Sequence, residues 1–369
     1  MYIKNLELNN FRNYTKLNIS FQQKVNIILG KNGQGKTNLL EGIYLLSMGK
    51  SFRTNRDSEM INFDEEYFRV KGEFIKNQHD LTVEMRLSKK EKLFKIDGIK
   101  KNKNADLLEN VYTVIFSPED LKTVKEEPDK RRRFIDRQLF QLKPLYYKDL
   151  ARYKKVVKNR NSTLKEEGVD LGLLDVWDTY MAEYGAKIMM ERRELLEKLN
   201  IVSGEINHNI TNGKEVLKIE YEPKIEVKDT LEEQQQEIIY ALRSRRTRDI
   251  DRKNTTAGPH HDDIKITIDD IDTRKFGSQG QQRTAALSLK LAELKIIKEE
   301  TDEDAILLLD DVLSELDSDR QNYLINSFKE NQIFISAAEI SDNVLEKLPG
   351  SKIYNVSHGE ILFPTNHIL

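Results

Sequence analysis

The sequence predicts an α/β fold whose main domain, the head, is assembled from both ends of the chain. Residues 30–37 match a phosphate-loop pattern between an apolar strand and a helix. A second apolar strand, residues 305–309, ends in two aspartates, and residues between about 120 and 253 have a helical pattern. We therefore predict a head with an antiparallel β-subdomain, formed by residues 1–119 and 254–369. A mostly helical second domain, residues 120–253, is inserted into it.

The phosphate loop is the strongest of these signals. It reads Gly30, Lys31, Asn32, Gly33, Gln34, Gly35, Lys36, Thr37. A strand is predicted at residues 25–29 and a helix from Asn38 onward, so backbone N–H groups and a helix N-terminus converge on phosphates. Lys36 is then expected at the β- and γ-phosphates of a nucleoside triphosphate and Thr37 at Mg²⁺. The alternative is an ordinary Gly-rich turn, which the flanking strand and helix disfavour.

The acidic strand is the natural complement of that loop. Apolar residues 305–309 are typical of a buried parallel strand, and ligands bind at the carboxyl edge of such sheets. Asp310 is expected to hold Mg²⁺, and Asp311 to orient or deprotonate the attacking water. A strand that merely ends in acidic residues is the alternative.

A Ser- and Gly-rich turn precedes the acidic strand. Ser278, Gln279 and Gly280 lead into a predicted helix at residues 284–298, where they form either a second anion cradle or a simple helix cap. With the acidic strand at the usual distance, the turn resembles the signature motif of the ABC-type ATPases. In that superfamily the signature faces a nucleotide held by another subunit. The resemblance implies an ATP-dependent homodimer, with Ser278 near the γ-phosphate bound by its partner.

Further motifs narrow the resemblance to one branch. They lie at residues 6–14, 50–54, 116–121, 131–136 and 258–263. Together with the phosphate loop, the signature and the acidic strand, they resemble the RecF family of bacterial recombinational repair proteins, from residue 1 to beyond residue 319. The long insertion between Lys36 and Ser278 is typical of this SMC-like branch. Transporter ATPases have a much shorter insertion, and SMC proteins a far longer one that carries a coiled coil.

The resemblance implies an ATP-dependent DNA-binding protein of replication, recombination and the SOS response to DNA damage. An ATP-driven homodimer would clamp duplex DNA near single-strand gaps or junctions, and weak, DNA-dependent ATP hydrolysis would release it. ATP and Mg²⁺ are the implied cofactors, RecR is an implied partner, and Arg12, Asn13 and Asn38 are implied nucleotide contacts. The alternatives are a transporter's nucleotide-binding subunit and an SMC-type structural chromosome protein.

Three positions depart from the patterns that carry the resemblance. The family more often has a histidine where Phe52 stands and a basic residue where His261 stands. The switch histidine of ABC ATPases is also missing, because Ala337 and Ala338 follow the apolar run at residues 332–336. The group that senses the γ-phosphate is therefore left open, and slow turnover is expected.

Composition limits the class of protein. The 369 residues are 38% apolar and 33% charged, with a net charge of −2 and no cysteine. Disulfides, cysteine zinc sites and thiol chemistry are therefore excluded. No apolar run has the length of a membrane span, and no signal peptide is visible, so we expect a cytoplasmic protein that does not bind membranes. The near-neutral charge means that any DNA site is a local patch.

Basic clusters are the candidates for that patch. They comprise Lys50, Arg53 and Arg56 after the phosphate-loop helix, Lys154, Lys155, Lys158 and Arg160 in the inserted domain, and Arg243, Arg245, Arg246 and Arg248 in the densest run. Each cluster taken alone is more typical of a solvated helix face, and the family resemblance is what favours contact with DNA. The run His260, His261, Asp262, Asp263 suggests a metal site only weakly. We expect a structural or nucleotide-linked turn there, because adjacent ligands rarely suit one ion.

Hydrophobic patterning places the remaining elements. Alternating apolar positions at residues 68–75, 81–87 and 93–96 predict antiparallel strands with one solvated face. Trp177, Met181, Tyr184 and Ile188 recur at helical spacing. After a polar break, Leu195, Leu199, Val202 and Ile206 repeat that spacing. We interpret this stripe as the packing face of a helical arm, and not as a cofactor site.

Overall fold

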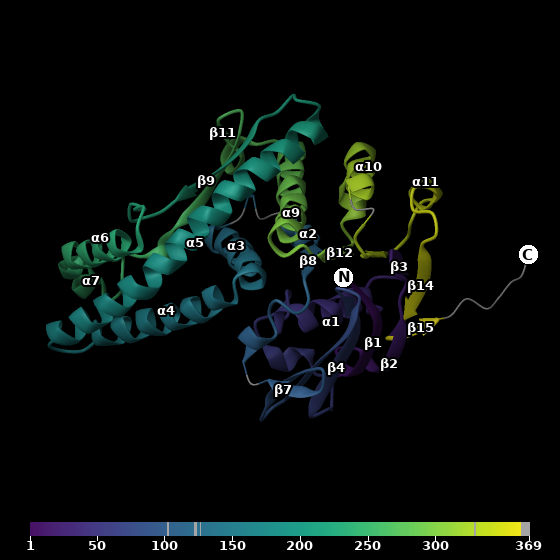
Figure 1. Ribbon diagram of the computed structural model, residues 1–369, viewed down its shortest axis with the longest axis horizontal. Helices are drawn as coiled ribbons and strands as arrows, with labels where there is room; N and C mark the ends of the chain where they lie inside the picture. Colours follow the sequence, from purple (N-terminus) through teal and green to yellow (C-terminus); the bar gives the residue numbers. More distant parts are fainter. Residues whose placement is uncertain (102, 122–123, 126, 328–329, 363–369) are drawn as a thin grey trace, which may run out of the picture. The chain divides into compact units, whose positions relative to one another are not determined.

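The computed structural model describes residues 1–101, 103–121, 124–125, 127–327 and 330–362. The chain divides into two compact units (Figure 1). The head comprises Met1–Lys122 and Ala286–Leu369, and the arm comprises Thr123–Ala285. No helix in the described ranges is long and apolar enough to span a membrane.

The core of the head is a six-stranded sheet in the order β15-β14-β3-β13-β12-β8. Its strands are β3 (Val25–Leu29), β8 (Thr113–Phe116), β12 (Ile306–Asp310), β13 (Ile333–Ala337), β14 (Lys352–Ser357) and β15 (Glu360–Leu362). All neighbours pair in parallel except the β14–β15 hairpin. In register, Asp310 pairs with Ser336 and Ala337 with Leu29. The carboxyl ends of β3, β13 and β12 therefore lie side by side, and this edge carries the candidate site.

A second sheet in the head is antiparallel, as the alternating pattern predicted. Its order is β2-β1-β4-β5-β6-β7. The strands are β1 (Tyr2–Phe11), β2 (Tyr14–Ser20), β4 (Tyr67–Lys76), β5 (His79–Ser88), β6 (Lys92–Ile96) and β7 (Ile99–Lys101). Phe68, Val70 and Phe74 on β4 are fully buried, whereas the residues Arg69 and Lys71 that alternate with them are partly exposed. One face of this sheet thus contributes to the core.

Helix α1 (Lys36–Met48) packs against strands of both head sheets. Its apolar residues face all directions, since Leu39, Leu40, Ile43 and Leu45 are all buried. That all-round burial anchors the phosphate loop, which α1 continues. The other helices of the head are α2 (Pro118–Leu121), α10 (Ser318–Ser327), α11 (Asp342–Glu346), and the 3₁₀ turns η1 (Asp57–Met60), η2 (Asn104–Asp106) and η4 (Leu313–Glu315). Helix α9 (Gln279–Thr301) begins in the arm and continues into the head.

The arm is built on one long helix, α5 (Leu171–Thr211), which packs against α4, α6 and β9. Its 41 residues span about 60 Å at 1.5 Å per residue. The other elements are α3 (Pro128–Leu142), α4 (Pro144–Thr163), α6 (Leu231–Ser244), α7 (Arg246–Arg252), α8 (Thr273–Phe276), η3 (Pro259–His261), β9 (Leu217–Glu222), β10 (Asp263–Ile268) and β11 (Ile271–Asp272). The three strands form a small sheet in the order β11-β10-β9.

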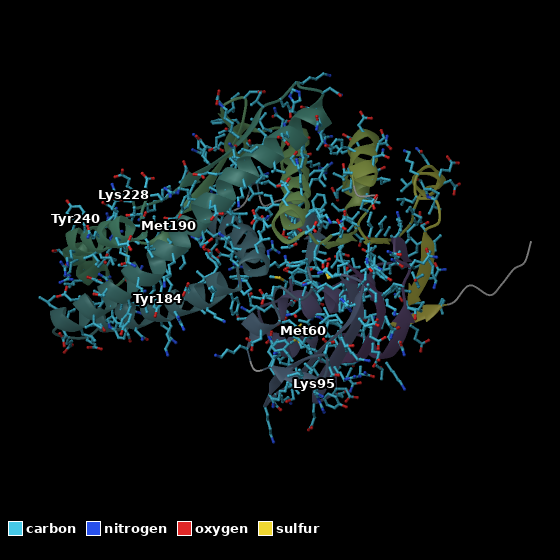
Figure 2. The ribbon with its side chains drawn as sticks, viewed as in Figure 1. Met60, Lys95, Tyr184, Met190, Lys228 and Tyr240 are labelled. Carbon is cyan, nitrogen blue, oxygen red and sulfur yellow. The ribbon has the colours of Figure 1, made fainter. Side chains whose placement is uncertain are left out.

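The predicted stripe on α5 lies on the buried face of the helix, except that its two aromatic residues are partly exposed. Met181 and Ile188 are fully buried, whereas Tyr184 is partly exposed and stacks on Tyr180 (Figure 2). The polar break predicted before Leu195 is absent, because α5 continues through it. Arg192 in that stretch is buried, and its guanidinium donates 2.9 Å to Asp136 of α3. At this point of α5, a buried arginine paired with an aspartate takes the place of an apolar side chain, so a polar residue in the sequence does not interrupt the helix.

The second expected domain boundary differs from the structure. It was placed at residue 253, whereas the arm extends to Ala285. The reason is the small sheet, since β10 pairs along its whole length with β9. Arg131 of α3 also holds Asp263 with two hydrogen bonds of 2.8 Å. These contacts bind residues 254–285 to the arm.

Candidate nucleotide-binding site

The phosphate loop joins β3 to α1 at the carboxyl edge of the parallel sheet. Gly35 lies at φ +122°, and a Cβ there would lie 2.8 Å from Asn13 Nδ2. A Cβ at Gly30 would lie 2.4 Å from the carbonyl oxygen of Val356. Only glycine fits these two positions, so the loop stays closely packed and its backbone N–H groups can approach a phosphate.

Lys36 is buried at the first position of α1, and its ammonium lies over the loop. Nζ donates to the carbonyl oxygen of Gly30 at 2.7 Å and lies 4.0 Å from Asp311 Oδ2. These contacts hold the cation where phosphates enter a loop of this kind. Contact of Lys36 with the β- and γ-phosphates stays a prediction.

Thr37 and Asp310 meet in the structure, although 273 positions separate them in the chain. Thr37 Oγ1 donates to Asp310 Oδ1 at 2.9 Å, and Ser336 Oγ donates to the same oxygen at 2.7 Å. Mg²⁺ prefers hard oxygen ligands and is usually held by one or two protein oxygens, phosphate oxygens and water. The Thr37 hydroxyl and the Asp310 carboxylate are such a pair, so the residues present fit the ion.

Asp311 is held in the left-handed region at φ +51°. Its backbone N–H donates to both the carbonyl oxygen and Oγ of Ser336, each at 3.1 Å. Burial raises the pKa of the Asp311 carboxyl; nearby Lys36 opposes this rise and Asp310 adds to it. A carboxylate with a raised pKa beside the phosphate loop is suited to accept a proton from water.

Two hairpins hold the phosphate loop from outside. At the β1–β2 turn, Asn13 Nδ2 donates to the carbonyl oxygen of Gln34 at 2.8 Å, and Tyr14 OH donates to that of Gly35 at 3.0 Å. At the β14–β15 turn, the N–H of His358 donates to Gln34 Oε1 at 2.7 Å, and that of Gly359 to the Gln34 carbonyl at 3.0 Å. Sequence reasoning missed the second hairpin, for which the only local signal is its His-Gly turn.

Arg12 is engaged with α1. Its Nε and Nη2 donate to the buried carboxylate of Glu41 at 2.8 and 2.7 Å, and Nη1 donates to the carbonyl of Glu59 at 2.6 Å. This pair braces the helix that begins at the phosphate loop. A direct contact of Arg12 with nucleotide stays a prediction, as does one of Asn13.

The basic segment after α1 is tied to the same helix. Lys50, Arg53 and Arg56 are all exposed. Arg53 Nη1 donates to Asn38 Oδ1 at 2.6 Å, and Asn38 Nδ2 donates to Asn13 Oδ1 at 2.7 Å. Since Asn13 also contacts the phosphate loop, polar contacts run without a break from Gln34 to Arg53.

The signature turn starts α9 with a reciprocal capping box. Gln281 N–H donates to Ser278 Oγ at 3.2 Å, and Ser278 N–H donates to Gln281 Oε1 at 3.0 Å. Ser278 and Gln279 are at least partly exposed. Locally the turn is therefore a capped helix start, the simpler of the two interpretations. Contact of Ser278, Gln279 and Gly280 with nucleotide on a second chain stays a prediction.

The densest basic run in the sequence divides into two kinds of arginine. Arg246 donates to Asp175 at 2.5 Å and Asp178 at 2.7 Å, both on α5. Arg245 donates to the carbonyl oxygens of Thr256 and Lys224 at 3.2 and 3.4 Å. Arg243 and Arg248 are exposed, and Arg243 lies 3.9 Å from Asp175. Two of the four candidate DNA contacts therefore support the arm internally.

The turn at residues 258–263 uses its polar side chains within the arm. His260 Nδ1 lies 2.7 Å from Tyr153 OH, and His261 Nε2 lies 2.9 Å from the carbonyl of Thr255. Asp262 accepts from the N–H of Lys224 at 2.8 Å. In the part of the chain that the structure describes, no group of three His, Cys, Asp or Glu side chains is placed to hold a metal ion.

A phosphate loop, a Thr–Asp pair at the same edge of the parallel sheet and an antiparallel sheet packed on α1 define a P-loop ATPase head of the SMC type. A model of the RecF/RecN/SMC N-terminal domain matches residues 2–360. The chain is 45% identical over 364 residues to the DNA replication and repair protein RecF of Clostridioides difficile, covering 98% of each. It is 42% identical to the protein of that name from Alkaliphilus oremlandii, covering 98% of this chain and 100% of the relative. The chain belongs to the RecF family.

Solved structures agree with this assignment. The recombination mediator protein RecF with ATP, of the RecFOR pathway, superposes with a TM-score of 0.91 at 40% identity, covering 98% of this chain and 97% of that one. An SMC head bound to the C-terminal winged-helix domain of ScpA superposes with a TM-score of 0.53 at 17% identity, which shows a shared fold alone. The predicted fold class is confirmed.

Proposed function

We propose that this chain is an ATP-dependent DNA-binding protein of replication and recombinational repair that acts in the cytoplasm. The observation that supports the proposal is the arrangement of Lys36, Thr37, Asp310 and Asp311 around the phosphate loop at one sheet edge. Relatives that match over nearly the whole chain are named for DNA replication and repair, and a similar solved structure is that of the recombination mediator protein RecF with ATP. ATP and Mg²⁺ are the proposed ligands of the site.

ATP would act by joining two chains. Ser278 lies at the N-terminus of α9, where the helix dipole favours an anion. In the proposed dimer this end of one chain faces the ATP held by the other, and the closed pair clamps duplex DNA. Asp311 orients or deprotonates the attacking water, and hydrolysis then releases the DNA. Turnover is expected to be slow, because Ala337 and Ala338 stand where a switch histidine would be.

DNA would be held through its phosphates and with weak sequence preference. Lys50, Arg53 and Arg56 support this because they are exposed and their segment is joined to the phosphate loop through Asn38 and Asn13. Gapped or junction DNA is the proposed form of the substrate. RecR is the proposed protein partner, since a close structural relative is described as part of the RecFOR pathway.

The direct test is the size of the protein with ATP, ADP or no nucleotide, each with and without duplex DNA. Light scattering should show a dimer when ATP is present and a monomer with ADP or no nucleotide. DNA should bind only when ATP is present. A mass that does not depend on nucleotide, together with no DNA binding, contradicts the proposal.

A mixing experiment tests whether two chains share each ATP. Ser278→Arg should leave ATP binding to the monomer intact but block dimerisation, since a long side chain fills the space that a phosphate needs. In a heterodimer of Lys36→Met with Ser278→Arg, one shared site carries both lesions and the other carries neither. ATPase activity should therefore return on mixing two inactive proteins. If heterodimers form without any activity, each site lies within a single chain.

A further inference from the structure

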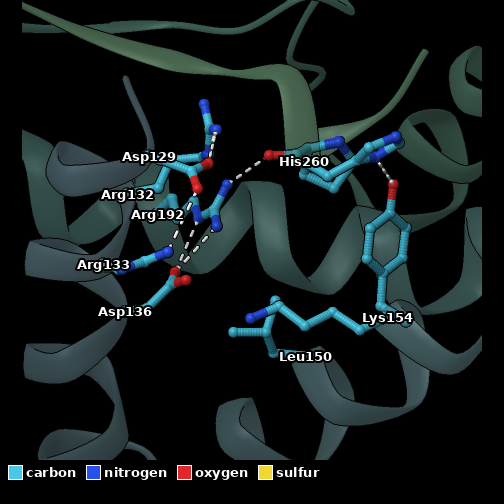
Figure 3. Close-up of a pocket in the computed structure, with 10 residues that line it drawn as sticks. Asp129, Arg132, Arg133, Asp136, Leu150, Lys154, Arg192 and His260 are labelled. Carbon is cyan, nitrogen blue, oxygen red and sulfur yellow. Dashed lines mark hydrogen bonds and ion pairs between the residues drawn. The ribbon is translucent and has the colours of Figure 1, made fainter. Parts of the chain in front are cut away.

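The arm contains a cavity of about 180 Å³ that the proposed function does not use (Figure 3). Side chains from α3, α4, α5 and the turn at η3 line it. It lies beside the Gly258–Pro259–His260 turn, a motif that the sequence marked out and that the nucleotide site leaves unexplained. The space holds several water molecules, and hence a small polar group.

The charge of the lining favours an anion. Arg132, Arg133, Lys154 and Arg192 line the cavity with only two carboxylates, Asp129 and Asp136. Both carboxylates already pair with arginines: Arg192 donates to Asp136 at 2.9 Å, and Asp129 accepts from Arg132 and, at 3.5 Å, from Arg133. A cation therefore meets a net positive lining, and the described residues contain no set of three ligands for a metal ion. Net positive charge in a partly enclosed space attracts oxyanions.

The walls of the cavity are fixed before any ligand binds. Arg192 is buried and makes further hydrogen bonds to the Pro259 carbonyl at 2.7 Å and to Tyr146 OH at 3.0 Å. Gly258 lies at φ +126°, and a Cβ there would lie 2.2 Å from Tyr153 OH. Only glycine lets the turn pack this closely against Tyr153. A site whose side chains are already ordered loses less entropy when it binds.

The ring of His260 adds a neutral polar wall. Burial lowers its pKa to about 3, so the ring is uncharged at neutral pH. Burial also raises the pKa of Tyr153 well above its usual value, so the phenol keeps its proton and donates to His260 Nδ1. The ring proton then lies on Nε2, which is buried. An uncharged ring at this position does not repel an anion.

We propose that this cavity binds a phosphate group, held by the exposed side chains of Arg133 and Lys154 and by the less exposed Arg132 and Arg192. Guanidinium groups match the geometry of phosphate oxygens, and their own carboxylate partners keep them oriented. The phosphate belongs either to a small phosphorylated ligand or to a nucleic-acid backbone. This inference concerns the arm alone and does not depend on the ATP-driven dimer.

The test compares two charge-matched double variants of the full chain. Arg133→Met with Lys154→Met removes two cations that line the cavity. Lys130→Met with Lys155→Met removes two exposed cations of the same helices that do not line it. Inorganic phosphate is titrated calorimetrically with the phosphate loop filled by a non-hydrolysable ATP analogue. The cavity variant should bind phosphate at least about tenfold more weakly than the wild type, whereas the control should change less than about twofold.

A second measurement identifies the source of the phosphate. Binding of a short duplex is measured for the same variants, with inorganic phosphate as competitor. A loss of duplex affinity in the cavity variant alone, with competition by phosphate, assigns the group to a nucleic-acid backbone. A loss of phosphate binding alone assigns it to a small ligand. Two outcomes overturn the proposal. In the first, the two double variants change the affinity for both ligands equally. In the second, the wild type binds no inorganic phosphate and the cavity variant binds the duplex as tightly as the wild type does.

Discussion

In the head, Lys36 and Asp311 at the phosphate loop hold one another loosely, whereas the buried charged residues of the arm make close contacts with one another. Lys36 contacts two loop carbonyls and approaches Asp311 only to 4.0 Å. Arg160 in the arm is completely buried and donates to both Asp178 and Asp249 at 2.7 Å. Charge in the head is thus available to a ligand, whereas much of the charge in the arm stabilises the fold. The density of basic residues along the sequence does not show whether they bind a ligand or stabilise the fold.

The largest effect is expected from breaking the buried pairs of the arm. Arg160→Met leaves Asp249 without a cation in a dry interior, which should cost about 3–5 kcal/mol of unfolding free energy. The only tryptophan in the sequence, Trp177, lies on α5 and donates to Thr163 Oγ1 at 3.2 Å, so its fluorescence reports unfolding of the arm. Exposed Arg248→Met should change stability by no more than about 0.5 kcal/mol. Equal stability of the two variants contradicts a structural role for Arg160.

In the head, removing the carboxylate of Asp311 should affect chemistry and leave binding unchanged. Asp311→Asn should lower ATP hydrolysis by about a hundredfold or more, the usual contribution of a general base. Because burial raises the pKa of this carboxyl, the wild-type rate should fall as pH drops through a value above the ordinary range of aspartate. Single-turnover rates across pH test this, with Glu315→Gln as the matched control. If Asp311→Asn hydrolyses ATP at the wild-type rate, Asp311 is not the general base, and Glu315 is the next candidate.

Lys36→Met should weaken ATP binding without unfolding the head. The charge-assisted hydrogen bond that it removes is worth roughly 1.5–3 kcal/mol, or about ten- to a hundredfold in affinity. Lys31→Met in the same loop should have a much smaller effect, since the Lys31 side chain is exposed. Calorimetric titration with ATP measures both. Equal affinities for the wild type and Lys36→Met would remove the phosphate site from consideration.

The divided arginine run sharpens the comparison within the arm. Replacing exposed Arg243 and Arg248 by alanine should flatten the salt dependence of DNA binding, by about one in slope for each DNA phosphate that is no longer neutralised. Replacing Arg245 and Arg246 should instead lower the stability of the arm, because they hold Asp175, Asp178 and two backbone carbonyls. If both pairs alter the slope equally, the run acts as one DNA-binding surface.

Local patterns predicted the parts of the site that are continuous in sequence. The phosphate loop, Asp310 and Asp311 each lie at the end of a strand, and parallel strands bring their carboxyl ends together. The antiparallel sheet followed from alternation along single strands. Each of these inferences needs only neighbours in the chain.

The parts that were missed depend on contacts between distant residues. Gln34 meets His358, and Arg246 meets Asp175 and Asp178, at separations that no local pattern spans. The boundary placed at residue 253 failed to match the arm for the same reason, because β9 and β10 are far apart in sequence. A basic run likewise gives no sign of whether carboxylates on another helix neutralise it.

The smallest change in stability is expected from a substitution of Ser278 in the signature turn. Such a variant distinguishes a role in capping the helix from a contact with nucleotide. Glycine replaces serine at a helix N-cap at a cost of only a few tenths of a kcal/mol. Ser278→Gly should therefore leave the unfolding transition nearly unchanged, although the bond from Gln281 N–H to Ser278 Oγ is removed. If that hydroxyl also contacts the partner's ATP, dimerisation by ATP should still weaken measurably in analytical ultracentrifugation. Gln281→Ala is the matched control, since it removes the other half of the capping box and keeps the hydroxyl. Weaker dimerisation in Ser278→Gly alone assigns the hydroxyl to the nucleotide, whereas equal dimerisation in both variants restricts Ser278 to starting the helix.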